Sequence, residues 1–305
     1  MKGFRLLFNC AVFLLLSTVL IAQKVSVIEM FGKIQISTAD GKSFQNLVYG
    51  DYPMDRKVNL EQNARLTLSK SNGEICQLNQ KGTYALASLK FGKPQSTSAA
   101  GIFDNLCAFF KAHPSSESKE QYKNSIYAIS RGEVTTPFAV FPFEGKVPMI
   151  DNSVLFRWDI DCDTCAYELV IKDLFTRKEL LRQDCEGLQY KLENADKVLK
   201  VDGKYYWFVK VKHQPTSSNQ ILFDMVSNAE YESTIGTLEK EISSSKQELG
   251  KDSKLAFILN GLDSEDLGNF AYIFGQKQVD SNKGNENIEE IYNRYVYDKL
   301  NNTEK

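Results

Sequence analysis

Cysteine provides the most specific chemical spacing in this chain of 305 residues. Cys162 and Cys165 form a C-x-x-C motif, which occurs in dithiol oxidoreductases and in zinc sites. Redox catalysis needs a thiol with a lowered pKa, usually at the N-terminus of a helix. Here the motif joins two predicted strands, and the carboxylates of Asp161, beside the motif, and Asp163, within it, would raise the thiol pKa. The spacing therefore favours a structural disulfide over redox catalysis.

Three further cysteines leave the disulfide pairing open. Cys185 follows the neighbouring predicted strand and can pair with Cys162 or Cys165, whereas Cys76 and Cys107 can join the first β region to its helix. A zinc site with Cys185 as third ligand lacks an evident fourth ligand, so we predict no metal site. Because these disulfide candidates are odd in number, one thiol is expected to stay unpaired.

Histidine and clustered aspartate are the other residues that could do chemistry. Neither His113, at the end of a predicted helix, nor His213, at a strand end, lies in a nucleophile motif. The run Asp159, Asp161 and Asp163 has the spacing of part of a calcium loop but lacks the glycine and distal glutamate of such loops. We therefore expect a solvated acidic turn, no catalytic residue and no cofactor.

The overall composition is that of an ordinary globular protein. Hydrophobic residues make up 42% of the chain and charged residues 25%, and the formal net charge is −2. These values exclude a largely disordered chain and a multi-span membrane protein. A near-neutral balance also argues against nucleic acid as a partner.

Residues 1–22 have the layout of a signal peptide. Lys2 and Arg5 precede an uncharged apolar run over 6–21, and Ala22 offers a small residue for cleavage. The run is shorter than the roughly 20 residues that a membrane-spanning helix needs. Cleavage predicts an exported protein, periplasmic or at the cell surface. An uncleaved segment would instead hold the protein at the membrane.

The elements that must position these residues begin with a β region over 24–95. Ile34 and Ile36 lie among polar neighbours with the period of two that half-buried strands show. Leu66 and Leu68 lead into Asn72-Gly73, and Asn-Gly between alternating runs predicts a β-hairpin.

This region resembles the extracytoplasmic β domain of FecR-type iron-transport regulators. The resemblance rests on the spacing of glycine, apolar and turn residues, namely Gly32-Lys33-Ile34, Asp40-Gly41, Leu47, Gly50, Val58, Ala64 to Leu68, Asn72-Gly73-Glu74 and Gly82-Thr83-Tyr84. Members of that family carry a cytoplasmic segment that engages a sigma factor, but only about five residues precede the apolar run here. The resemblance therefore implies the domain without the signalling activity.

A helix is predicted over 97–112. Ile102, Leu106, Phe109 and Phe110 recur on one helical face, which we expect to pack on the β domain. Residues 114–125 are polar and predict a linker, so the first domain is expected to extend from 23 to 133.

Residues 134–228 predict a second β domain. Phe156, Trp158 and Ile160 alternate with Arg157 and Asp159, and further runs with the same period follow. Strands of this length separated by turns favour a β-sandwich.

This segment resembles a fibronectin type III or related immunoglobulin-like module. Trp158 stands where the module has its early core tryptophan, and Leu199 and Tyr205, followed by Trp207, match the approach to its tyrosine corner. The resemblance implies that these four residues belong to the core and that the Tyr205 hydroxyl bonds nearby backbone. It gives no activity, because such sandwiches host many roles.

Residues 229–305 are predicted to be helical. Ile235, Leu238 and Ile242 have heptad-like spacing, Asp263 is a predicted N-cap, and Asn285 is expected to start the last helix. The final hairpin resembles one helical repeat of the tetratricopeptide kind, and one repeat is too few for an array. We expect a helical cap packed on the neighbouring sandwich. A peptide-binding or dimerising module is the alternative.

The sequence thus predicts a multidomain, mainly β fold with two all-β modules and an α-helical C-terminal region. We expect an exported, non-catalytic binding or scaffolding protein of the bacterial cell envelope that engages a protein or cell-wall glycan. The alternatives are a C-x-x-C thiol–disulfide enzyme, a carboxylate-based hydrolase, and an envelope signalling protein retained by an uncleaved N-terminal segment.

Overall fold

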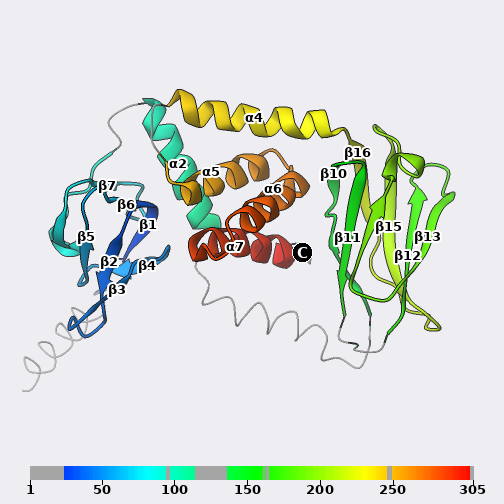
Figure 1. Ribbon diagram of the computed structural model, residues 1–305, viewed down its shortest axis with the longest axis horizontal. Helices are drawn as coiled ribbons and strands as arrows, with labels where there is room; N and C mark the ends of the chain where they lie inside the picture. The colour runs from blue at the N-terminus through cyan, green and yellow to red at the C-terminus, as the bar shows by residue number, and fades with distance from the viewer. Residues whose placement is uncertain are drawn as a thin grey trace, which may run out of the picture. The chain divides into compact units, whose positions relative to one another are not determined.

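The computed structural model describes most of the chain that follows the predicted leader (Figure 1). The described residues are 24–93, 97–113, 136–160, 162, 165–245 and 249–302. The predicted signal peptide, the polar linker over 114–125, Asp161 and Asp163 lie outside these ranges. The chain divides into two compact units, and the division falls between Phe103 and Asp104, within helix α2 (Thr97–Ala112).

The first unit is built from two four-stranded antiparallel sheets. The sheets have the orders β4-β1-β6-β7 and β3-β2-β5-β8. The elements are β1 (Lys24–Phe31), β2 (Ile34–Ser37), β3 (Phe44–Asn46), β4 (Asp51–Pro53), β5 (Lys57–Leu60), β6 (Arg65–Ser69), β7 (Ile75–Leu78), β8 (Gly82–Ala85) and the short 3-10 turn η1 (Leu86–Ser88). The β character predicted for residues 24–95 is therefore confirmed over the described residues of that range, 24–93.

The predicted hairpin joins β6 to β7. Gly73 has a φ of 81°, and the Asn72 side chain accepts a hydrogen bond from the backbone N–H of Glu74 at 3.1 Å. Leu66 and Leu68 are buried, and so is Thr67 between them, whose hydroxyl donates to the Glu29 carboxylate at 2.6 Å, so β6 is covered on both faces. Helix α2 has the predicted bounds, and Ile102, Leu106, Phe109 and Phe110 are all buried.

The second unit contains a β-sandwich. A five-stranded sheet has the order β10-β16-β15-β12-β13, and a three-stranded sheet has the order β14-β11-β9. The strands are β9 (Phe138–Phe141), β10 (Gly145–Pro148), β11 (Ser153–Asp159), β12 (Tyr167–Asp173), β13 (Glu179–Cys185), β14 (Gln189–Glu193), β15 (Lys204–Val211) and β16 (Ile221–Val226). Side chains from both sheets share one core, including Phe156 of β11 and Trp207 of β15.

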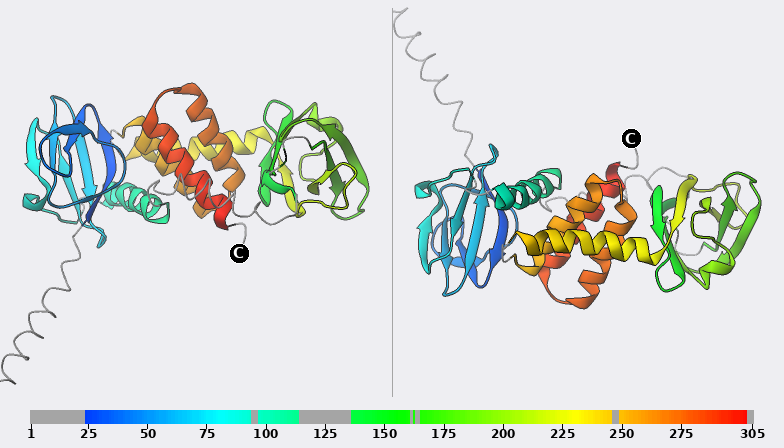
Figure 2. Two further views of the ribbon diagram at one scale, coloured as in Figure 1. Left: turned by 90° about the horizontal axis from the view of Figure 1, so that it is seen from below. Right: turned by 90° about the horizontal axis from the view of Figure 1, so that it is seen from above.

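In the described part of the chain, four helices follow the sandwich. They are α4 (Asn228–Ser244), α5 (Lys251–Ser264), α6 (Gly268–Ser281) and α7 (Glu286–Asn302). Helix α4 runs along one side of the other three (Figure 2). Ser227 caps α4 by accepting from the Glu230 N–H at 3.1 Å, and the Asn285 carboxamide accepts from the first turn of α7.

The N-cap predicted at Asp263 is wrong. The apolar run from Leu255 to Leu262 continues as helix, so Asp263 lies in the last turn of α5, and α6 begins only at Gly268. The Asp263 carboxylate instead accepts from the Tyr295 hydroxyl at 3.3 Å and pairs with Lys299 of α7.

Helix α6 packs directly on the sandwich. Asn269, which is 1% exposed, accepts from the Phe143 N–H at 2.7 Å and donates to the carbonyls of Phe143 and Lys146 at 3.0 and 3.1 Å. Tyr272 stacks on Phe141 with ring centroids 4.2 Å apart and accepts from Arg157 at 2.6 Å. Buried polar groups with satisfied bonds fix geometry, so sandwich and helices form one body. Among the described helices, none is long and apolar enough to cross a membrane.

Candidate functional site

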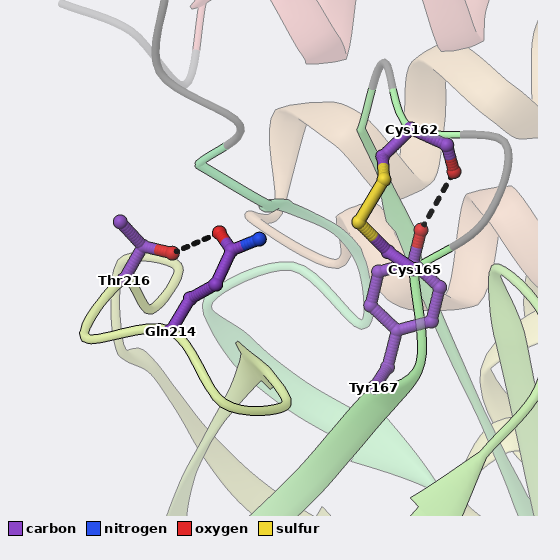
Figure 3. Close-up of a disulfide and its surroundings, with 5 residues drawn as sticks. All are labelled: Cys162, Cys165, Tyr167, Gln214 and Thr216. Atoms are coloured by element: carbon purple, nitrogen blue, oxygen red, sulfur yellow. Dashed lines mark hydrogen bonds between the residues drawn. A yellow bond between two sulfur atoms is a disulfide. The ribbon is translucent and has the colours of Figure 1, made fainter.

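The C-x-x-C motif closes on itself as a disulfide at one end of the sandwich (Figure 3). Cys162 and Cys165 have Cα atoms 5.6 Å apart, within the range that a disulfide spans. The Tyr167 hydroxyl donates to the Cys162 carbonyl at 3.3 Å, and the Lys212 N–H donates to the Ala166 carbonyl at 2.9 Å. The motif lies between strands β11 and β12. Among the described residues around the motif, no helix begins that would stabilise a thiolate as in a dithiol enzyme.

The other cysteines are not paired as we expected. Cys76 and Cys185 are buried thiols and Cys107 is a half-buried one, so neither a Cys76–Cys107 bond nor a bond from Cys185 to the motif is present. The spacing of three within the motif lets its two sulfurs meet inside one loop. The Cys185 thiol instead points towards the sandwich core and donates to the Gln183 carbonyl at 3.5 Å.

Thiol labelling gives a direct test of this pairing. Burial raises the pKa of the Cys76 and Cys185 thiols, so both should resist N-ethylmaleimide in the native protein at pH 7.5 to 8.5, around the ordinary thiol pKa. In denaturant both should label without reductant, whereas Cys162 and Cys165 should label only after reduction. Peptide mass spectrometry reads out each site. Labelling of Cys165 in unreduced, denatured protein would contradict the assignment.

The two histidines have unrelated surroundings. His113 is 2% exposed, with its ring 4.6 Å from Phe109 and 5.6 Å from Tyr295, and its Nδ1 lies 3.4 Å from Asp298. His213 is exposed in the turn after β15. Within the described residues, no group of three or more His, Cys, Asp or Glu side chains could hold a metal ion.

The four residues predicted for the sandwich core are buried there. They are Trp158, Leu199, Tyr205 and Trp207. The Tyr205 hydroxyl accepts from the Lys200 N–H at 2.7 Å and donates to the Lys200 carbonyl at 3.3 Å, and the Trp207 indole donates to the Pro142 carbonyl at 3.3 Å. These residues build the domain and offer no surface to a ligand.

The face of strand β15 that points away from the core carries a second set of aromatic residues. Tyr206 and Phe208 point away from the core, stack with centroids 6.3 Å apart, and pack with Val170 and Leu174. Lys172 and Lys210 lie over the Phe208 ring at 5.9 and 5.6 Å. Arg177 lies over the Tyr206 ring at 5.3 Å. We call this set the cation–aromatic face; its members are Lys172, Arg177, Tyr206, Phe208 and Lys210.

The cations cover the rings without a close ion pair, although the Glu179 carboxylate attracts Lys172 and Lys210 from a longer distance. The nearby carboxylates of Glu168 and Glu179 both bind Arg182, whose hydrogen bonds lower the pKa of Glu179. In the described part of the chain, no carboxylate lies within ion-pair distance of Lys172, Arg177 or Lys210. Cation–π contacts at exposed sites are worth about 0.5–1 kcal/mol each, so opening all three would cost roughly 1.5–3 kcal/mol, which a partner's own contacts must repay.

A hydrogen-bonded turn beside the cation–aromatic face carries an exposed aromatic ring. Phe175, between β12 and β13, is 76% exposed. The Asp173 carboxylate fixes the turn by accepting from the Phe175 N–H, the Thr176 N–H and the Thr176 hydroxyl at 3.1, 2.7 and 2.8 Å. The same bonds from Thr176 and Phe175 lower the pKa of Asp173. A large apolar side chain held out by its turn is available to a partner at small entropic cost.

The cation–aromatic face was not predicted from the sequence, although the residue pattern of β15 indicates it. Tyr206 and Phe208 occupy the alternating positions that face solvent in a half-buried strand, where polar residues are expected. A strand with aromatic residues on both sides needs a second apolar environment.

Comparison with known proteins does not identify a family for this chain. No family model matches the chain, and no curated protein matches it. Among solved structures, FN3tt is 18% identical, with 31% of this chain and 97% of that one covered at a TM-score of 0.22. The fibronectin(III)-like modules of Clostridium thermocellum CbhA are 8% identical, with 65% and 79% covered at a TM-score of 0.22. The FN1–FN3 domains of chicken CNTN1 are 8% identical, with 67% and 57% covered at a TM-score of 0.22.

The solved structures that resemble the chain thus include fibronectin type III domains. The assignment of the second β domain as a sandwich rests on its own strand pairing and shared core. The resemblance of the first β domain to FecR-type regulators stays a prediction.

Proposed function

We propose that this is an exported, non-catalytic binding protein of the bacterial cell envelope that engages a protein partner through the cation–aromatic face. The carrying observation is the outward pair Tyr206 and Phe208 beneath three cations without ion-pair partners, flanked by the exposed Phe175. Aromatic residues and arginine are the side chains that most often supply binding energy at protein interfaces.

The same geometry favours a protein over a glycan. A sugar ring stacks on an open aromatic plane, but Tyr206 and Phe208 are only 6% and 7% exposed. A protein segment with carboxylates beside an apolar side chain can take up the cations and fill the space over the rings. Export is supported by the predicted leader and by the Cys162–Cys165 disulfide, since disulfides persist in oxidising compartments.

Charge reversal on this face gives the test. In Lys172→Glu/Lys210→Glu, the capture of the partner from a cross-linked envelope fraction should fall at least about tenfold, because an interfacial attraction becomes a repulsion. Phe175→Ala should weaken capture without changing its dependence on salt. Quantitative mass spectrometry identifies the partner, and titration of the purified partner then measures Kd at two salt concentrations.

The control is Lys197→Glu/Lys283→Glu, which makes the same charge change at exposed positions outside this face. Far-UV circular dichroism establishes that all variants are folded. Equal capture by both double variants would overturn the proposal. Co-sedimentation with protein-free peptidoglycan that the Lys172→Glu/Lys210→Glu variant abolishes would replace the protein partner with a glycan.

A further inference from the structure

A separate pocket of 350 Å³ opens between helices α4, α5 and α6. Its floor is apolar and comes from Ile242, Leu255, Ile258 and Phe274. The remaining lining residues are polar or charged: Glu239, Ser243, Lys251, Lys254, Gln278 and Asn282. This pocket has the size of a small-molecule site, and its lining is more polar than that of most such sites.

One wall of the pocket is positively charged. Lys251 and Lys254 are three residues apart on α5 and so share a face of that helix. The Lys251 ammonium donates to the neutral Asn282 carboxamide at 3.2 Å, and the Asn282 amide donates to the Gln278 carbonyl at 2.8 Å. Within the described ranges, neither lysine forms an ion pair. Two cations therefore line the pocket above its apolar floor; Asn282 is the neutral acceptor of Lys251, and Glu239 is the one acidic residue among the described residues of the lining.

We infer that this pocket binds an amphiphilic organic anion of small-molecule size, with a carboxylate on an apolar body. The apolar body would lie against Leu255, Ile258 and Phe274. The carboxylate would accept from Lys251 and Lys254 through charge-assisted hydrogen bonds, which are about twice as strong as neutral ones. Glu239 on the α4 wall makes a body with several negative charges a poorer fit. This site is independent of the cation–aromatic face.

The inference is tested with three eight-carbon probes that differ only in their head group. Octanoate, octanol and octylamine are titrated into the full mature protein while saturation-transfer NMR and calorimetry measure binding. Octanoate should bind at least about tenfold more tightly than octanol, and octylamine should bind more weakly still. In Lys251→Met/Lys254→Met, the preference for octanoate over octanol should disappear, because the apolar stems remain and the charges do not.

Lys240→Met/Lys283→Met serves as the matched control, since both lysines are exposed and neither lines the pocket. A second variant, Ser243→Trp, fills the pocket from its rim and should abolish octanoate binding while the helical circular dichroism is retained. Equal affinity for octanol and octanoate, or octanoate binding unchanged in both pocket variants, would overturn the inference. Binding of the peptide acetyl-Leu-Glu-Leu-Glu-amide without binding of octanoate would overturn the small-molecule class.

Discussion

Asn269→Ala should lower the free energy of unfolding of the second unit by about 3 kcal/mol, because it strips three backbone groups of their buried partner. Asn269 is 1% exposed and bonds the N–H and carbonyl of Phe143 and the carbonyl of Lys146. For about 200 residues this corresponds to a fall in Tm of about 6–12 °C. Differential scanning calorimetry and urea titration measure the change.

The matched control is Asn293→Ala on α7, an exposed position where the change should stay within about 0.5 kcal/mol. Asn269 lies at the junction between the sandwich and α6. In its variant, the single unfolding transition of the second unit should therefore split into two, one for the sandwich and one for the helices. A single transition at the unchanged temperature would show that this amide does not hold the junction.

Gly203→Ala should destabilise the sandwich by about 2–3 kcal/mol through a steric clash with Tyr205. A β-carbon at Gly203 would overlap the Tyr205 hydroxyl and Cζ and would lie 2.8 Å from its Cε2. The ring cannot move freely, because its hydroxyl bonds both backbone groups of Lys200 and its face packs in the core. Urea unfolding followed by tryptophan fluorescence measures the loss.

Gly187→Ala provides the control, since nothing lies within 4 Å of an added β-carbon there. In a Tyr205→Leu background the cost of Gly203→Ala should fall close to zero, which assigns the effect to the ring. If Gly203→Ala costs no more than Gly187→Ala, the ring is not held as the structure indicates.

Local periodicity predicted much of this fold. Strand β11 was predictable from Phe156 and Trp158, and the β6–β7 hairpin from Asn72-Gly73, because both depend on nearest neighbours in the sequence. The end of α5 was not predictable in this way. Asp263 has the residue type of an N-cap, but the packing of α5 against α7 extends the helix through it.

The candidate sites depend on contacts distant in sequence. The cation–aromatic face needs β12 beside β15, which places Lys172 opposite Tyr206 and Val170 opposite Phe208. The pocket between α4, α5 and α6 needs these three helices to meet. Which cysteines pair depends on where the Cys185 side chain points, and the spacing of the cysteines in the sequence does not predict that direction.

The junction at Asn269 and Tyr272 has a consequence for affinity. It fixes the sandwich to α6, so the cation–aromatic face and the pocket between α4, α5 and α6 keep a constant separation, which a flexible linker would not maintain. Once a partner occupies one site, a second group linked to it meets the other site at a fixed effective concentration. Binding at the two sites, each weak alone, would then give one tight attachment. Only a partner whose two binding groups are spaced like the two sites would gain this increase in affinity.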